Sequence, residues 1–228
     1  MAMKLPRPLK GWRVLAGEVG TIVLGVLIAL GAQEFVQSLH WNREVRETRK
    51  ALDAELARDL AVFEQRYRNR GCVADRLTEI SHWADSLFAG KPLRLKHDIE
   101  EPPFFLVRTA AWEVTDGEIA SRIPLEAKLN YAAFYDGLRQ YTELKKIESD
   151  AWAKIYQYGS ASRLDPADFR VIKGALKDIA DANQAMEPFR TAFDRFSRAL
   201  AISPQTSLEG ANSPMFQQWQ REACAPLL

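Results

Sequence analysis

Cysteine and histidine, the commonest zinc ligands, are scarce in this chain. Its 228 residues include two cysteines, Cys72 and Cys224, and three histidines, His40, His82 and His97. None has a second Cys or His at the spacing of a zinc ligand pair, and no H-E-x-x-H occurs. The serines lack a G-x-S-x-G context, and there is no glycine-rich phosphate loop. The sequence therefore predicts no catalytic residue, no metal ligand and no cofactor-binding residue.

An excess of charge of either sign is also missing. Lys and Arg number 31 and Asp and Glu number 30, a formal net charge of +1. So balanced a chain has no overall field that would favour nucleic acid, and we expect no nucleic-acid partner. Hydrophobic residues make up 47% and aromatic residues 10% of the chain, enough for a packed core, so wholesale disorder is excluded.

What the sequence does contain is one long apolar stretch, residues 14–36, which follows a basic N-terminal tail, residues 1–13. The only charges of the stretch are Glu18 and Glu34, towards its two ends. As a helix its 23 residues span about 34 Å, whereas the hydrocarbon core of a bilayer is about 30 Å thick. We expect residues 14–36 to form a single transmembrane helix in the lipid bilayer.

Two other interpretations of this stretch stay open. Its strictly uncharged run, residues 19–33, covers about 22 Å as a helix, and Ala29-Leu30-Gly31 offers small residues for cleavage of a secretory signal peptide. A buried core helix of a soluble protein is the other interpretation. Against cleavage, residues 32–70 contain neither Gly nor Pro, whereas a cleavage site is usually presented in an extended segment. The retained anchor is therefore favoured.

Small residues recur at every fourth position of the apolar stretch, at Gly17, Thr21, Gly25 and Ala29. This spacing places them on one side of a helix. Small residues so arranged let two helices approach closely in lipid, which predicts a homodimer formed through the transmembrane helix. The general abundance of glycine in membrane helices is the competing explanation.

Helical periodicity dominates the rest of the chain. Apolar residues at three- and four-residue steps predict helices over 34–69, 73–88 and 124–158, with a short buried helix over 104–114. Gly71 is expected to separate the first two. The third is expected to turn one apolar stripe inward, formed by Leu125, Leu129, Ala132, Tyr135, Leu138, Tyr141 and Leu144. Arg66 is expected at the solvated C-terminal end of the first, where cations suit the helix dipole.

The clearest helix start is Asp165-Pro166, a capping residue followed by a proline in the first turn. The helix after it repeats an apolar residue every seven positions, which predicts packing against other helices, at Ile172, Ile179, Met186, Phe193 and Leu200. Ser213 caps a last short helix. The predicted fold class is all-α: an N-terminal transmembrane helix followed by a helical-bundle domain, residues 37–228, of about five or six helices.

One turn of the chain is rich in carboxylates. Glu113, Asp116 and Glu118 follow Trp112 closely, and such a cluster can bind a cation or carry out acid–base chemistry. These four residues are a candidate pocket. The competing interpretation is a solvated turn between helices, with Trp112 in the core beneath it.

Two stretches together resemble a family of bacterial membrane-anchored helical proteins. The family's N-terminal run, GEI…VIGILIAL…NW.E, is similar to Gly17-Glu18-Val19, residues 22–30 and residues 41–44 of this chain. Its second pattern, W…SG.L…L…YY, is similar to Trp112, residues 116–119, Leu129 and Tyr135. This chain departs from the family with Asp116 where a serine is usual. The resemblance implies a single-pass anchor and a helical domain, and it brings no activity with it.

The two cysteines indicate which cellular compartment contains the domain. A short basic tail is most simply left inside the cell, which sends the domain across the membrane. In an oxidising compartment Cys72 and Cys224 would pair, and each is expected at the end of a helical element, where backbones can approach. We predict a disulfide, and a periplasmic domain held at the bacterial inner membrane. Two free thiols in a cytoplasmic domain are the competing state.

Two classes of function are consistent with these features. The first is a membrane-anchored, non-enzymatic interaction or scaffold module that presents a helical surface to a protein partner. The second is a ligand sensor or enzyme with a pocket near the 112–118 turn. The lack of catalytic motifs favours the first.

Overall fold

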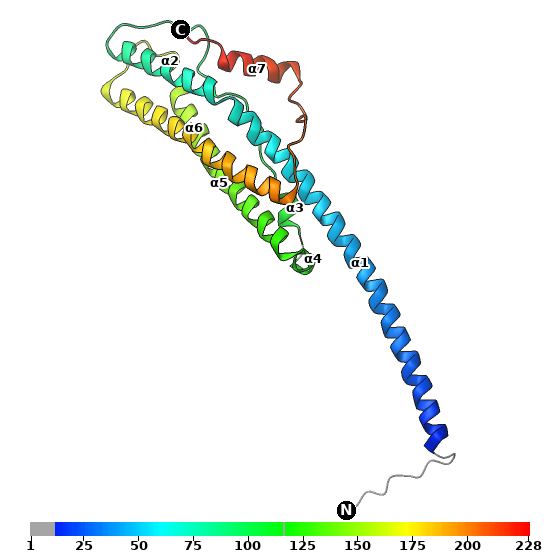
Figure 1. Ribbon diagram of the computed structural model, residues 1–228. Helices are drawn as coiled ribbons and strands as arrows, with labels where there is room; N and C mark the ends of the chain where they lie inside the picture. Colours follow the sequence, from blue (N-terminus) through cyan, green and yellow to red (C-terminus); the bar gives the residue numbers. More distant parts are fainter. Residues whose placement is uncertain (1–11, 116) are drawn as a thin grey trace, which may run out of the picture. The chain divides into compact units, whose positions relative to one another are not determined.

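The computed structural model describes residues 12–115 and 117–228, and every regular element in those ranges is an α-helix (Figure 1). Seven helices follow one another in this part of the chain: α1 (Trp12–Arg68), α2 (Arg70–Phe88), α3 (Ala110–Glu113), α4 (Gly117–Arg122), α5 (Leu125–Tyr156), α6 (Pro166–Leu200) and α7 (Pro214–Cys224). The predicted all-α class is confirmed, with one long apolar helix first and a helical domain after it. Most of the predicted basic tail, residues 1–11, lies outside the described residues.

The chain divides into two compact units at the boundary between Thr48 and Arg49. The first unit contains the apolar stretch, and the second contains the last turns of α1 and all the other helices. α1 itself runs for 57 residues without a break, as expected of a stretch that lacks Gly and Pro from residue 32 onward.

The break between α1 and α2 lies at Asn69, so the prediction that Gly71 separates the two helices was wrong. The Asn69 backbone N–H donates to Arg66 O at 3.2 Å, and the Asn69 side chain accepts a hydrogen bond from Gln220 at 3.4 Å. The bond to Arg66 O reaches three residues back instead of four, which is the pattern of a tight turn and not of a continuing α-helix. Gly71 lies inside α2, which ends before Gly90, a glycine in the left-handed conformation with φ +72°.

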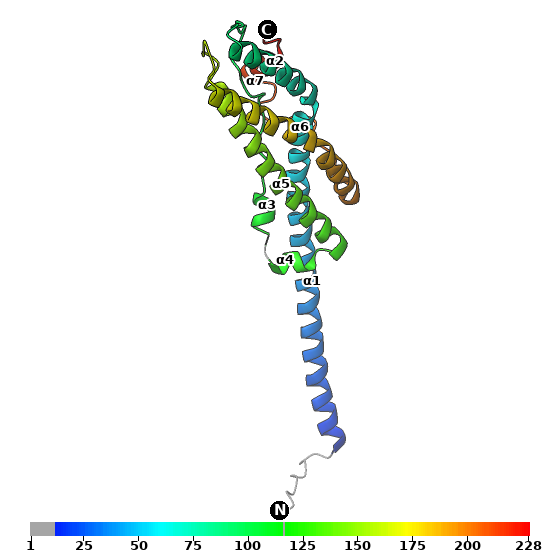
Figure 2. The same cartoon turned by 90° about the vertical axis from the view of Figure 1, so that its left-hand side faces the viewer.

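α5 and α6 lie side by side over much of their length (Figures 1 and 2), and α2 packs against α6. The five residues of the predicted seven-residue repeat are all buried in α6, which confirms its packing role. Gly137 of α5 marks the closest approach: a Cβ there would lie 2.9 Å from the ring of Phe193. That ring stacks on Phe134 of α5 and meets Phe63 of α1 edge-on, so one aromatic cluster joins three helices.

The inward face of α5 differs from the predicted one. Leu125 and Leu129 are 65% and 59% exposed, and the buried stripe begins at Tyr131. The tyrosines can face inward because their hydroxyls find carboxylates on α1: Tyr131 donates to Asp53 and Tyr135 donates to Glu55. Tyr135, Leu138 and Tyr141 were predicted on this face and are buried, whereas Tyr131 was missed because its acceptor on α1 was not foreseen.

The short buried helix predicted for residues 104–114 is reduced to α3, whose four residues are not buried. The chain before it is extended up to Thr109. Backbone N–H groups that a helix would pair internally instead donate to α1: Arg108 to Asp59 and Ala111 to Glu55.

Candidate functional site

The first unit exposes apolar side chains on all sides of α1. An 18-residue window there has a mean hydropathy of 1.9, and none of it is buried. Val19, Ile22, Leu27 and Phe35, for example, are 49–67% exposed. Soluble monomers rarely expose contiguous apolar surface on this scale. By its length and composition this helix can cross a membrane.

The predicted small-residue positions Gly17, Thr21, Gly25 and Ala29 all lie in this helical stretch. The Thr21 hydroxyl donates to Gly17 O at 2.9 Å, so its polar group is already satisfied within the helix. A Cβ placed on Gly17 or on Gly25 would meet no other atom within 4 Å, so this side is open. The homodimer that the spacing predicts stays a prediction.

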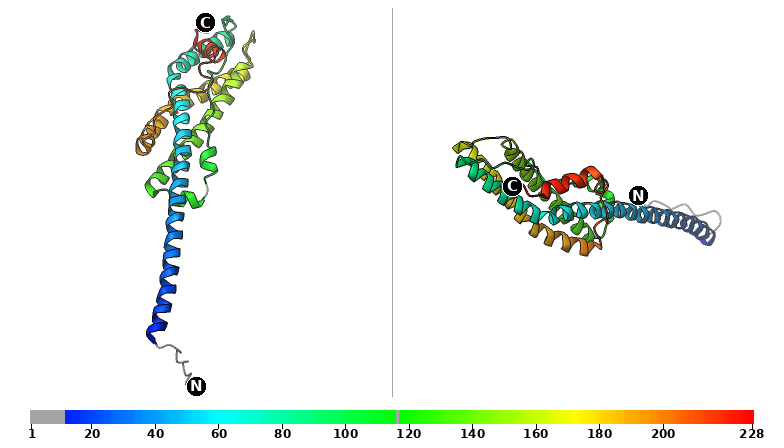
Figure 3. Two further views of the ribbon diagram at one scale, coloured as in Figure 1. Left: turned by 90° about the vertical axis from the view of Figure 1, so that its right-hand side faces the viewer. Right: turned by 90° about the horizontal axis from the view of Figure 1, so that it is seen from above.

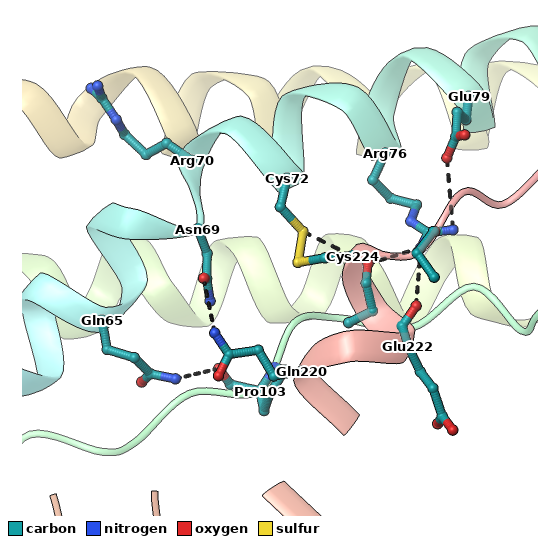
Figure 4. The surroundings of a disulfide bond; sticks show 12 residues. Gln65, Asn69, Arg70, Cys72, Arg76, Glu79, Pro103, Gln220, Glu222 and Cys224 are labelled. Carbon is teal, nitrogen blue, oxygen red and sulfur yellow. Dashed lines mark hydrogen bonds and ion pairs between the residues drawn. A yellow bond between two sulfur atoms is a disulfide. The ribbon is translucent and has the colours of Figure 1, made fainter. Parts of the chain in front are cut away.

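Cys72 of α2 and Cys224 of α7 form the predicted disulfide (Figure 4), with their Cα atoms 5.3 Å apart. The bridge joins residues 152 positions apart and fastens the last helix to α2, beside which it lies (Figure 3).

A buried arginine strengthens this junction. Arg76 is 3% exposed, and its Nη2 donates to Ala223 O at 2.8 Å and to Ala225 O at 2.5 Å (Figure 4). These carbonyls end α7 and have no partners within that helix, so the guanidinium caps it. Burial lowers the pKa of Arg76, while nearby Glu79 partly opposes the shift. Glu79 also accepts the Leu227 N–H at 3.0 Å, which fixes the C-terminal tail.

A second polar cluster lies at the centre of the domain. Arg66 of α1 makes a two-point contact with Glu148 of α5, with Nη2 2.6 Å from Oε1 and Nε 3.2 Å from Oε2. The two side chains are 2% and 1% exposed. Arg66 Nη2 also donates to Asn183 Oδ1 of α6 at 3.2 Å, so the cluster connects three helices.

Lys145 and Glu101 complete this cluster. Lys145 Nζ donates to Glu148 Oε2 at 3.0 Å and also to Glu101, which accepts a further hydrogen bond from Ser149 at 2.9 Å. Burial alone would raise the pKa of Glu148, but Arg66 and Lys145 outweigh it and hold that pKa below its usual range. Burial raises the pKa of Glu101 despite Lys145. Two cations therefore compensate two carboxylates, an arrangement suited to holding helices in register.

The expectation that Arg66 lies at a solvated helix end was wrong. A signal for its burial was present in the sequence: Leu52, Leu56, Asp59, Phe63 and Arg66 follow one another at three- and four-residue steps. Two charged residues on an apolar stripe indicate buried polar partners. The identity of those partners, 82 residues away for Glu148, depends on how the helices pack.

Carboxylates of α1 also fix the extended segment that precedes α3. Both oxygens of Asp59 accept the Arg108 N–H, at 3.1 and 3.0 Å, and Arg58 lies 2.8 Å from Oδ1. Burial raises the pKa of Asp59 to about 7, although Arg108 and Arg58 both oppose the shift. Burial, followed by the hydrogen bond to Asp53, raises the pKa of Tyr131 to about 12. These groups are structural contacts between α1 and its neighbours.

The residues of the predicted carboxylate pocket have separate surroundings. Trp112 is half-buried and stacks on Tyr135, with ring centres 5.2 Å apart. Glu113 is exposed and accepts a hydrogen bond from Thr109 at 2.6 Å, while the exposed Glu118 pairs with Arg122 at 3.2 Å. Asp116 lies outside the described residues. The structure thus shows two of the carboxylates engaged on their own turns.

The three histidines are all exposed, and among the described residues no group of three His, Cys, Asp or Glu side chains is placed to hold a metal ion. Comparison with protein-family models, with curated proteins and with solved structures finds no match.

Proposed function

We propose that this chain is a membrane-anchored, non-enzymatic helical module that holds its domain at a bilayer surface for interaction with a protein partner. The observation that carries the proposal is the fully exposed apolar stretch of α1, with its mean hydropathy of 1.9. A lipid environment would cover this surface, which the domain does not bury. The resemblance of residues 17–30 and 41–44 to bacterial single-pass helical proteins supports the same assignment.

The domain is proposed to be periplasmic, with the protein in the bacterial inner membrane. The Cys72–Cys224 disulfide supports this side, because structural disulfides form and persist in oxidising compartments and are rare in the cytoplasm. The face of Gly17, Thr21, Gly25 and Ala29 is the proposed contact of a homodimer. In this proposal the Arg66–Glu148 cluster serves to keep the presented helices in register.

The side of the membrane is tested by fusing alkaline phosphatase, which is active only after export, to the C-terminus of the full chain in a Gram-negative host. A fluorescent protein that matures only in the cytoplasm gives the opposite readout at the same site. We expect an active phosphatase and a dark fluorescent protein. In parallel, alkylation of freshly lysed cells should find no free thiol on the native chain. A bright fusion together with two alkylated cysteines would contradict a periplasmic domain.

A further inference from the structure

A cleft of about 320 Å³ lies between the extended residues 104–107 and one face of α5. Residues 104–107 form the outer wall of this cleft, and contacts outside the cleft fix their position. Phe105 stacks on Phe216 of α7 with ring centres 4.7 Å apart, and Leu106 O accepts a hydrogen bond from Arg58 at 3.0 Å. Leu106 nevertheless remains 71% exposed beside the opening. The outer wall is therefore fixed by its contacts, while the apolar side chain of Leu106 at its edge stays exposed to solvent.

The α5 side of the cleft carries its polar groups. Tyr141 lines it and is 2% exposed, and its hydroxyl makes no hydrogen bond to another described residue. This hydroxyl is not among the fully enclosed polar atoms that lack a partner, so it touches solvent. Burial raises the pKa of Tyr141, so the phenol keeps its proton and can donate it in a hydrogen bond. An acceptor that enters the cleft can therefore take the place of water at this hydroxyl.

Two lysines of α5 line the same cleft and differ in how they are engaged. Lys145 is taken up by Glu101, Glu148 and the face of Phe104, whose ring centre is 4.1 Å from Nζ. Lys146 is exposed and has no ion pair among the described residues. Lys146 therefore places an ammonium group that is free to pair with an anion at the rim of a largely apolar cleft.

We propose that this cleft binds a fatty acid, with the acyl chain between Leu106 and α5 and the carboxylate at Tyr141 and Lys146. The acyl chain matches the apolar walls of the cleft. The carboxylate matches the hydroxyl of Tyr141 and the ammonium group of Lys146. The volume of about 320 Å³ is at the lower end of the range of small-molecule sites, about 300–1,000 Å³, so a medium-length chain fits. This site goes beyond the proposed function and does not rest on it.

The test uses dodecanoic acid carrying a photoreactive diazirine, added to the full chain in nanodiscs of phosphatidylcholine, with adducts mapped by mass spectrometry. We expect adducts on peptides that contain residues 104–107 or 141–149, competed away by excess dodecanoate. Thr142→Trp fills the cleft from an exposed position and should lower this labelling about tenfold. Tyr141→Phe and Lys146→Glu should each weaken competition by dodecanoate several-fold. Lys154→Glu is the matched control, an exposed lysine of the same helix outside the cleft, and should change nothing.

Several results would overturn the proposal. Labelling confined to residues 14–36 would show that the probe reports only the membrane helix. Labelling of the cleft peptides that persists unchanged in Thr142→Trp would place the ligand elsewhere. Dodecanol competing as well as dodecanoate would contradict recognition of a carboxylate. Displacement of the probe by an apolar peptide but not by dodecanoate would identify a peptide site instead. Because Lys146 is exposed, Lys146→Glu keeps the test decisive if another variant fails to fold.

Discussion

Replacing Arg66 with methionine tests whether the buried ionic cluster holds the helices of the domain together. The change removes the two hydrogen bonds to Glu148, at 2.6 and 3.2 Å, and leaves that carboxylate buried with Lys145 as its remaining cation. Removing one partner of a buried pair costs about 3–5 kcal/mol. Because Lys145 stays in place, we expect the lower end of this range for Arg66→Met. A loss of about 3 kcal/mol lowers the Tm of a domain of this size by about 6–12 °C.

The measurement is urea unfolding of the full chain in nanodiscs, followed by the fluorescence of the buried Trp83 and Trp152. The double variant Arg66→Met with Glu148→Leu should recover much of the loss, since an apolar pair of similar volume can replace a buried ion pair. Lys177→Met is the matched control, because it breaks the exposed Lys177–Asp181 pair and should cost less than about 0.5 kcal/mol. A loss of stability below about 1 kcal/mol for Arg66→Met would show that the buried ionic cluster does not hold the helices together. A double variant less stable than the single one would show the same.

Three further predictions concern the disulfide, a buried carboxylate and the membrane helix. Replacing Cys72 and Cys224 with serine opens a cross-link of sequence separation 152 and should cost up to about 5 kcal/mol in the chain-entropy account; a Tm by circular dichroism equal to that of the native chain would contradict this. The folded-state pKa of Asp59 is raised to about 7 from an unfolded value of 3.8, so the folded chain holds this proton more tightly, and stability should decline as the pH rises between those values. Asp59→Asn should flatten that decline in urea unfolding, and an unchanged slope would show that another group causes it. Gly25→Leu should weaken self-association in a membrane two-hybrid assay, whereas Gly31→Leu, off the small-residue face, should not; equal signals from both would favour glycine abundance as the explanation.

The features predicted well from the sequence depend on local chemistry. The side chain of Asp165 accepts from the N–H groups of Ala167 and Asp168, as a residue before Pro166 at a helix start should. The seven-residue repeat of α6 showed which face would be buried because apolar residues alone occupy it. The apolar stretch was identified from composition, and it lies in a single helix that continues beyond it to Arg68.

The features that were missed depend on partners far away in the chain. Tyr131 lies on the inward face of α5, where Leu125 and Leu129 were predicted, because Asp53 accepts its hydroxyl across the interface. Arg66 is buried because Glu148 lies opposite it. No single-sequence pattern gives the register of two helices, so a charged residue on an apolar stripe can be recognised, but its partner cannot be named. The same limit applies to the cleft beside α5, whose wall is an extended segment where a helix was predicted.

The claim that residues 14–36 are a retained membrane anchor is tested most directly by washing membranes that contain the full chain with alkaline carbonate and determining the N-terminus of what remains. We expect the protein to stay in the membrane pellet and to begin at its encoded N-terminus. A transmembrane helix resists this wash, whereas peripheral proteins are released. A control chain without residues 1–40 should appear in the supernatant. Recovery of the native protein as a soluble form beginning near Ala32 would show a cleaved signal peptide and contradict the anchor.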